Sequence, residues 1–223
     1  MDELIAAIRA ASPGETQSQV LELLEHHFTE GLLGAIYNGH SNVDLSAELI
    51  IFDVQAIFTD ETDATGRAAL NIIMNTINNQ LITNYRHNAA QRRRIVITID
   101  EAHLLLDRDN PETLKFLVRT VKRIRKYNGA LILTTQNPGD FADGAAGKGL
   151  TNILANIQYA LFLALKPQDV AAVDQLYRAS GGLTAYEQKH LTSLPVGACL
   201  FNPAPTYRKF IRLHYNPLEQ TIA

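Results

Sequence analysis

The stretch RIVITIDEAHLLL, residues 94–106, joins a short apolar run to two adjacent acids. The run from Ile95 to Ile99 is rich in β-branched residues and has no charged position. A strand that is apolar on both faces fits the centre of a parallel sheet covered by helices on both sides. Asp100 and Glu101 follow at the carboxyl end of this strand, where parallel sheets bind their ligands. The sequence therefore predicts a ligand site at these two acids.

Two acids after an apolar strand are typical of the Walker B motif of nucleotide-hydrolysing folds. In such folds the first acid holds Mg²⁺, usually through water, and the second orients and deprotonates the attacking water. This interpretation assigns Mg²⁺ to Asp100 and the role of general base to Glu101. A simpler interpretation is that Asp100 caps a helix that begins near Glu101, because Asp is a preferred N-cap residue. A cap explains neither the second acid nor the fully apolar strand, so we favour the nucleotide hypothesis.

The phosphate-binding counterpart of this motif is missing from the sequence. No segment fits G-x-x-x-x-G-K-[ST], the loop whose backbone N–H groups and Lys hold phosphates. The nearest candidate is DGAAGKGLT, residues 143–151, in which Gly149 stands where Ser or Thr is required. It also follows the two acids in the chain, whereas a phosphate-binding loop precedes them. We expect residues 143–151 to form a flexible Gly/Ala loop.

Composition is that of a soluble globular protein. The 223 residues are 46% hydrophobic, and the formal net charge of −3 lacks the basic excess of a dedicated nucleic-acid binder. Cys199 is the single cysteine, which excludes an intramolecular disulfide and a Cys-based zinc cluster. The N-terminus has no apolar signal core, and no apolar run approaches the length of a membrane span. We therefore expect a cytoplasmic protein.

Helical and strand patterns alternate along the chain, which favours an α/β fold. Expected helices cover residues 2–11, 16–29, 64–88, 111–127, 150–157, 168–177 and 185–191, with a Gly/Asn-rich connector at 31–42. Expected strands cover residues 48–54, 95–99, 130–135, 159–165, 197–201 and 208–213. The first four strands suggest a doubly wound, mainly parallel sheet, and the last two suggest an antiparallel hairpin or edge.

The order of these motifs resembles the C-terminal part of the conjugal-transfer ATPases of type IV secretion systems, the TraC/TrbE-like branch of the FtsK/HerA motor superfamily. The motifs that carry the resemblance lie between Gly34 and Leu200: IYNGHSNVDL, LIIFDV, IVITIDEAHLLL, VKRIRKYNGALILTTQNPGDF, ILANIQYALFLALK and LTSLPVGACL. A helicase with a DEAH string normally has a Ser-Ala-Thr type motif on the next strand. Here that strand ends in Thr134, Thr135 and Gln136.

The resemblance implies a RecA-like P-loop NTPase core, truncated, with N-terminal helices at residues 1–33 and a partial ATPase domain at 34–223. It also implies that Gln136 senses the γ-phosphate of ATP. The alternative for Gln136 is a side chain that satisfies loop backbone at a strand end. For His103, within the Walker B extension, coupling of the site to the following helix and a plain packing or capping role both remain open.

The helix expected at residues 111–127 carries a second clue. On a helical projection, Arg125 falls inside the apolar stripe formed by Leu114, Leu117, Val118, Val121 and Ile124. A buried guanidinium requires a partner, because an unpaired buried charge is expensive. The resembled family has a basic pair here, Arg125 and Lys126, which implies that they serve the nucleotide of a neighbouring subunit as an arginine finger. The alternative is that Arg125 reaches solvent and satisfies the last carbonyls of the helix.

Together these features predict the C-terminal fragment of a conjugation or type IV secretion motor ATPase, which couples ATP hydrolysis to DNA or protein transfer in the intact system. ATP and Mg²⁺ are the expected ligands of the intact system, but without a phosphate-binding loop we do not expect hydrolysis by this chain alone. Expected partners are other ATPase subunits, in a homo-oligomer or ring, and type IV secretion components at the inner face of the membrane. Charge does not support nucleic acid as a partner. The alternative is a non-catalytic module that binds full-length ATPase subunits.

Overall fold

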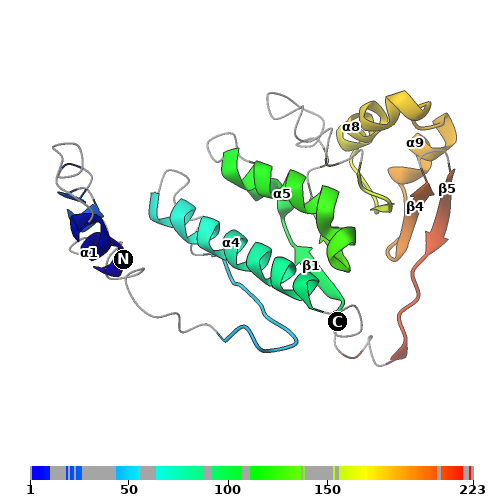
Figure 1. The fold of residues 1–223 in the computed structure, drawn as a ribbon. Helices are drawn as coiled ribbons and strands as arrows, with labels where there is room; N and C mark the ends of the chain where they lie inside the picture. Colours follow the sequence, from blue (N-terminus) through cyan, green and yellow to red (C-terminus); the bar gives the residue numbers. More distant parts are fainter. Residues whose placement is uncertain are drawn as a thin grey trace. The chain divides into compact units, whose positions relative to one another are not determined.

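The computed structural model describes residues 2–10, 19, 21–22, 24–26, 44–55, 64–87, 92–106, 111–136, 138, 153, 156–204, 207–217 and 221 (Figure 1). The chain divides into two compact units, Met1–Ala69 and Leu70–Ala223. The expected connector at residues 31–42 and the loop at 143–151 lie outside the described residues, as do most of the helices expected at 16–29 and 150–157. Among the described residues, no helix combines the length and the apolar character needed to cross a bilayer.

The first unit contains the helix α1, Asp2–Ala10, which confirms the first expected helix. The strand expected at residues 48–54 is wrong, because this segment is irregular. A strand is stabilised by hydrogen bonds to a neighbouring strand, and no described strand pairs with this segment. Its apolar side chains consequently stay in solvent, with Leu49 77% and Ile51 79% exposed.

The parallel part of the second unit consists of two strands and the helices on one of their faces. The helix α4, Ala64–Arg86, spans the boundary between the units and precedes β1, Ile95–Ile99. The 3₁₀ helix η4, Ala102–Leu106, leads into α5, Pro111–Arg123, and η5, Ile124–Tyr127. The strand β2, Gly129–Leu133, pairs with β1 in parallel, from Ile95 opposite Gly129 to Ile99 opposite Leu133. Figure 1 shows α4 and α5 side by side against these strands.

The core of this part brings α4, η5 and β1 together. Leu81, Ile97 and Ile124 are buried, and partly buried side chains surround them: Ile77, Ile95, Ile99, Tyr127 and Leu131. On the other face of the sheet Val96 is 62% exposed and Ile132 is 48% exposed. The expectation of a sheet covered on both faces is therefore not met within the described residues, where α4 and η5 cover one face.

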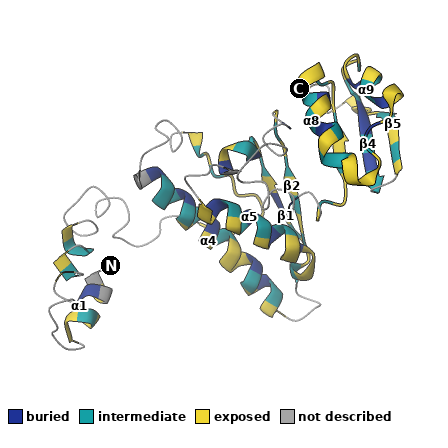
Figure 2. Cartoon of the chain, turned by 90° about the horizontal axis from the view of Figure 1, so that it is seen from above, coloured by how far each residue is buried: buried dark blue, intermediate teal, exposed yellow. Residues whose placement is uncertain are grey.

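The C-terminal part is an antiparallel sheet with two helices. The strands β3, Ala160–Phe162, β4, Ala198–Ala204, and β5, Tyr207–Arg212, follow the order β3-β4-β5. Between β3 and β4 lie α8, Pro167–Tyr177, η6, Arg178–Ser180, and α9, Ala185–Leu191. Buried residues gather along the central strand β4, whereas β5 is more exposed (Figure 2). The core residues are Val170, Val173, Leu183, Leu191 and Leu200.

The α/β class, with a parallel sheet and C-terminal antiparallel strands, is confirmed, and so is the expected terminal hairpin, β4 and β5. One strand belongs to a different sheet from the one expected. The segment expected at residues 159–165 as part of the parallel sheet is shorter and pairs antiparallel with β4, with Leu161 opposite Phe201. Its partner is therefore a strand some forty residues later, which no local pattern indicates.

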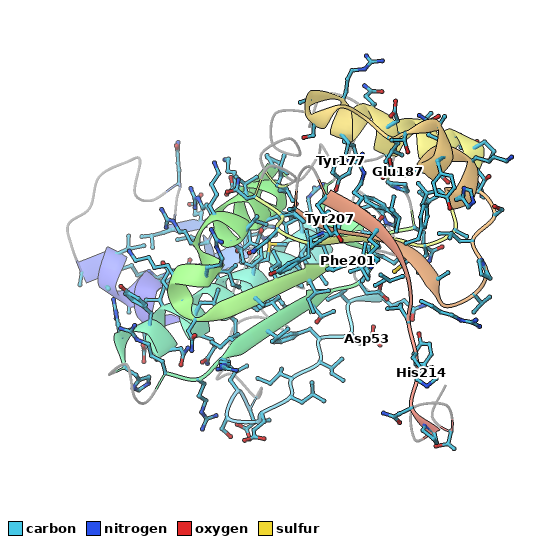
Figure 3. All side chains as sticks on the ribbon, turned by 90° about the vertical axis from the view of Figure 1, so that its right-hand side faces the viewer. Asp53, Tyr177, Glu187, Phe201, Tyr207 and His214 are labelled. Atoms are coloured by element: carbon cyan, nitrogen blue, oxygen red, sulfur yellow. The ribbon has the colours of Figure 1, made fainter. Side chains whose placement is uncertain are left out.

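A buried ion pair ties β5 to α9. Arg208 Nε donates to Glu187 Oε1 at 2.8 Å, and Arg208 Nη2 donates to the carbonyl oxygen of Gly182 at 2.7 Å. The guanidinium also lies over the ring of Tyr177, 5.6 Å from its centroid; Glu187 and Tyr177 are labelled in Figure 3. Glu187 in turn forms a capping box with Thr184 at the start of α9. Burial raises the pKa of Glu187, but the hydrogen bonds from Arg208 and Thr184 outweigh burial and hold it below its usual value.

Candidate functional site

The parallel register of β1 and β2 brings the residues after both strands together. Thr134 N–H donates to the carbonyl oxygen of Ile99 at 3.0 Å, and Ala102 N–H donates to the carbonyl oxygen of Thr134 at 2.8 Å. Pairing thus continues one step beyond the regular strands. It places the segment after β1, with Asp100 and Glu101, beside the segment after β2, with Thr134 and Gln136.

Asp100 is exposed, and two donors hold its carboxylate. The Thr134 hydroxyl donates to Oδ1, and Glu101 N–H donates to the same oxygen at 3.0 Å. The hydrogen bond from Thr134, followed by that from the Glu101 backbone, lowers the pKa of Asp100 from its ordinary value of 3.8. The side chain is therefore a carboxylate at neutral pH, which suits a hard cation such as Mg²⁺. Asp100 accepts from the N–H of the next residue, whereas an N-cap side chain accepts from an N–H two or three residues further on, and η4 begins only at Ala102.

Glu101 has an unusual backbone and a well-contacted side chain. Its φ of 47° lies in the left-handed region, which non-glycine residues visit uncommonly. The Gln136 side-chain amide donates to Glu101 Oε1, and His103 Nδ1 lies 3.1 Å from Glu101 Oε2. Thr135 Oγ1 lies 3.4 Å from the same His103 nitrogen. One oxygen of the Glu101 carboxylate thus accepts a hydrogen bond from Gln136, whereas the buried Oε2 lies beside His103 without a hydrogen bond.

The structure brings together three of the predicted site residues, Asp100, Glu101 and Gln136. It adds two that sequence reasoning left without a role: Thr134, which contacts Asp100, and Thr135, which contacts His103. His103 Nδ1 lies against Glu101 Oε2, so the His103 ring contacts the second acid from within η4. The sequence places both threonines directly before Gln136, which indicates that they lie near the site. Their contact partners depend on the register of β1 and β2, which the sequence does not show.

Arg125 and Lys126 lie at the other end of the sheet, because η5 precedes β2. The prediction that Arg125 sits inside the apolar stripe of its helix is wrong, since Arg125 is exposed. The α-helix ends at Arg123, and the following 3₁₀ turn has three residues per turn, so a projection at 3.6 misplaces this side chain. Ile124 is buried in its place, and Lys126 Nζ lies 5.6 Å from the ring centroid of Tyr85.

A metal at this site would rest on few protein ligands. Within the described part of the chain, no group of three or more His, Cys, Asp or Glu side chains could hold a metal ion. Mg²⁺ is commonly bound by one or two carboxylates together with water and substrate phosphates. The exposed, ionised Asp100 fits that pattern, in which water and nucleotide phosphates would supply the remaining ligands of the ion.

Comparison with known proteins identifies a family that covers the candidate site. The family described as "Helicase HerA-like C-terminal" matches residues 85–203, more than half of the chain. This chain belongs to that family. The matched segment contains all of the predicted site residues: Asp100, Glu101, Arg125, Lys126 and Gln136.

Two known proteins are similar to the chain over most of its length. The structure of VirB4 of Thermoanaerobacter pseudethanolicus is 30% identical with a TM-score of 0.70, covering 92% of this chain and 52% of that one. Protein TraC of Escherichia coli (strain K12) is 21% identical over 188 residues, covering 79% of this chain and 21% of that protein. The chain is therefore similar to VirB4 and TraC in sequence, and it shares the RecA-like fold of VirB4. It spans about half of the VirB4 chain and about a fifth of TraC.

Proposed function

We propose that this chain supplies the Walker B and sensor half of a type IV secretion motor ATPase. In the intact system, ATP hydrolysis drives the transfer of DNA or protein. The observation that supports this most is the contact between Gln136 and Glu101 beside Asp100. A polar side chain that reaches the second acid from the next strand can link the state of the γ-phosphate to the position of a general base.

Each residue has a distinct role in this proposal. Asp100 would hold Mg²⁺ through water, and the ion would supply positive charge against the phosphates. Glu101 orients and deprotonates the attacking water, and Gln136 senses the γ-phosphate. Arg125 acts in trans on the nucleotide of a neighbouring subunit, and Lys126 supports it there. The exposed position of Arg125 at the opposite end of the sheet from Asp100 is compatible with a trans role and not with service to its own site.

The proposal extends to the assembly. The N-terminal helices at residues 1–33 and the partial ATPase domain at 34–223 belong to a subunit that joins other ATPase subunits in a ring. The ring works on the cytoplasmic side, at the inner face of the membrane, with type IV secretion components as partners. A phosphate-binding loop comes from a segment that this sequence does not contain.

The first test is equilibrium binding of a labelled ATP analogue to the purified chain with Mg²⁺, beside ATP hydrolysis by the wild type and by Glu101→Gln. The variant is expected to keep whatever binding the wild type has and to lose any hydrolysis. Glu112→Gln is the matched control, since Glu112 is an exposed acid on α5 that pairs with Lys115 outside the site.

The alternative function is the non-catalytic interaction module, which the missing phosphate-binding loop favours. Absence of binding at millimolar nucleotide would support the module for the isolated chain. Hydrolysis that survives in Glu101→Gln would contradict the assignment of the base.

A further inference from the structure

A groove of about 360 Å³ lies between α4 and α5. Each helix leads into a strand of the parallel pair, so the two helices run in the same direction, and Figure 1 shows them side by side. The floor of the groove is buried: Met74, Leu81 and Thr120 are at most 6% exposed. All of its lining residues belong to the second unit, and none of them belongs to the site at Asp100.

The α4 wall of this groove is a row of asparagines. Asn71, Asn75 and Asn78 line it, and their spacing of four and three residues places them on one face of the helix. Asparagine is a weak helix former, so three of them in one row do not serve the helix itself. None of their carboxamides has a hydrogen-bond partner in the described part of the chain. The row is therefore available to a ligand.

A fourth asparagine of the same helix shows what such a side chain can hold. Asn84 donates to the Arg93 carbonyl oxygen at 2.8 Å and accepts from Arg93 N–H at 2.9 Å. One carboxamide thus satisfies both polar groups of a residue of non-helical backbone. Side chains one turn apart on a helix are about 5–6 Å from each other, and alternate residues of an extended chain are about 6.6 Å apart. A row of carboxamides consequently matches the main chain of an extended polypeptide.

The α5 wall of the groove carries positive charge. Phe116, Arg119 and Arg123 line it, spaced by three and four residues on one helix face. Both arginines are exposed, and neither pairs with a carboxylate among the residues that the structure describes. Glu112 is the one acid among the lining residues, and its carboxylate pairs with Lys115 at 2.6 Å. An occupant that complements this wall has to supply negative charge.

We infer that the groove binds an extended, acidic segment of a partner protein. The asparagines hold the main chain of that segment, and the guanidinium groups of Arg119 and Arg123 bind its carboxylates through paired N–H donors. From Asn71 to Ile82 the α4 wall rises by eleven steps of ~1.5 Å, roughly 16 Å, which accommodates about five residues of extended chain. Phe116 offers an apolar contact within that length.

The same walls fit a nucleic acid less well. A protein that binds a nucleic-acid backbone neutralises several phosphates with a series of cations, whereas this groove has two arginines on one wall and uncharged carboxamides on the other. The inference does not depend on ATP hydrolysis at Asp100 and Glu101. Its test leaves those residues intact, so the proposed function and the groove can fail separately.

The test is solution NMR of the ¹⁵N-labelled chain, in which the side-chain amides of Asn75 and Asn78 report on the groove directly. The probe is a synthetic pool of octapeptides with Glu at every second position and random residues between. The control pool has Gln in place of Glu. Saturable shifts of both amide signals are expected with the Glu pool, and the Gln pool should bind about tenfold more weakly, because it cannot form charge-assisted pairs.

Variants assign the binding to the two walls. Arg119→Ala and Arg123→Ala should each weaken it about tenfold, whereas Lys122→Ala, which removes an exposed lysine of α5 outside the groove, should change it by less than about twofold. Asn75→Ala should weaken binding about threefold without lowering the melting temperature, because Ala is the better helix former. Asn79→Ala is its matched control, since Asn79 is an exposed asparagine of α4 outside the groove.

Three results would overturn the inference at the level of the ligand: no shifts with the Glu pool, equal affinity for the two pools, or tighter binding of a single-stranded oligonucleotide that shifts the same signals. Amide shifts that depend on the concentration of the chain alone would assign the groove to a second copy instead. Binding that survives both arginine variants, or an equal loss in Lys122→Ala, would remove the role of the α5 wall. Circular dichroism verifies that each variant is folded.

Discussion

The side-chain amide of Gln136 donates a hydrogen bond to Oε1 of Glu101, a residue 35 positions earlier in the chain. The contact exists because β1 and β2 are parallel neighbours in register, so that the residues after both strands share one edge. The same edge holds Thr134 against Asp100 and His103 against Glu101. The acids are thus positioned by side chains that follow the next strand, and Glu101 also lies against His103 of η4.

Thr134→Val is expected to raise the pKa of Asp100 toward its ordinary value of 3.8, because the hydroxyl of Thr134 is the principal cause of the lowering. A lowered carboxyl pKa stabilises the fold above the unfolded pKa, and that stabilisation is lost as the pH falls through the folded pKa. The variant should therefore lose less stability than wild type when the pH falls below about 4.

Carboxyl ¹³C NMR of Asp100 across an acid titration measures this change directly. Thr192→Val is the control, since Thr192 is an exposed threonine after α9 whose hydroxyl donates to the Lys189 carbonyl oxygen. An Asp100 that titrates at the same pH in Thr134→Val and in wild type would contradict the assignment of the hydroxyl.

His103→Ala is expected to lower the free energy of unfolding by about 0.5–1 kcal/mol, the upper range for a partly exposed ion-pair contact. The substitution removes the ring nitrogen that lies 3.1 Å from the buried Oε2 of Glu101. Urea unfolding at neutral pH is the measurement. In His214→Ala, where an exposed histidine is removed from the C-terminal segment, stability should stay within about 0.5 kcal/mol of wild type. Equal losses in the two variants would show that the contact with Glu101 contributes nothing.

Arg208→Ala is expected to destabilise the C-terminal part by about 3–5 kcal/mol, because it leaves the carboxylate of Glu187 buried without its partner. Chemical unfolding followed by circular dichroism measures the loss. Lys209→Ala, at the next and exposed position of β5, should have little effect. If Arg208→Ala unfolds at the same urea concentration as Lys209→Ala, the ion pair does not stabilise the fold.

The lowered pKa of Glu187 also predicts that the stability of the protein depends on pH. Its pKa is lowered in the folded protein, so its contribution to stability is present above the ordinary value of 4.5 and is lost as the pH falls through the lower folded value. Wild type should therefore lose stability in mild acid by an amount that Glu187→Gln does not show. Unfolding curves at several pH values between about 3 and 6 provide the comparison, and parallel curves for the two proteins would refute it.

Gly129→Ala is expected to destabilise the parallel part by about 1–3 kcal/mol. A Cβ at this position would lie 2.7 Å from Ile124 Cγ1 and 3.1 Å from the carbonyl oxygen of Ile95. The start of β2 and the buried Ile124 would have to move apart. Thermal unfolding measures the cost, and an unchanged melting temperature would mean that the core adapts without loss.

Local sequence was sufficient for the elements whose stability depends on near neighbours in the chain. The helix α9 begins at the capping box of Thr184 and Glu187, three residues apart, and its bounds match the prediction. The apolar run of β1 and the pair Asp100 and Glu101 were equally visible, because strand propensity and motif spacing are local properties. The terminal hairpin followed from two short strands separated by a few residues.

Tertiary structure decided whatever depends on a partner distant in the chain. The apolar segment at residues 48–54 has the composition of a strand, but it pairs with none of the described strands. The strand β3, in contrast, pairs with β4. Arg125 lies outside the apolar stripe because the α-helix gives way to a 3₁₀ turn at the buried Ile124. The contacts of Thr134 with Asp100 and of His103 with Glu101 arise from strand register and local packing. Hydrogen bonds between strands set that register, and their partners cannot be identified from the composition of either strand alone.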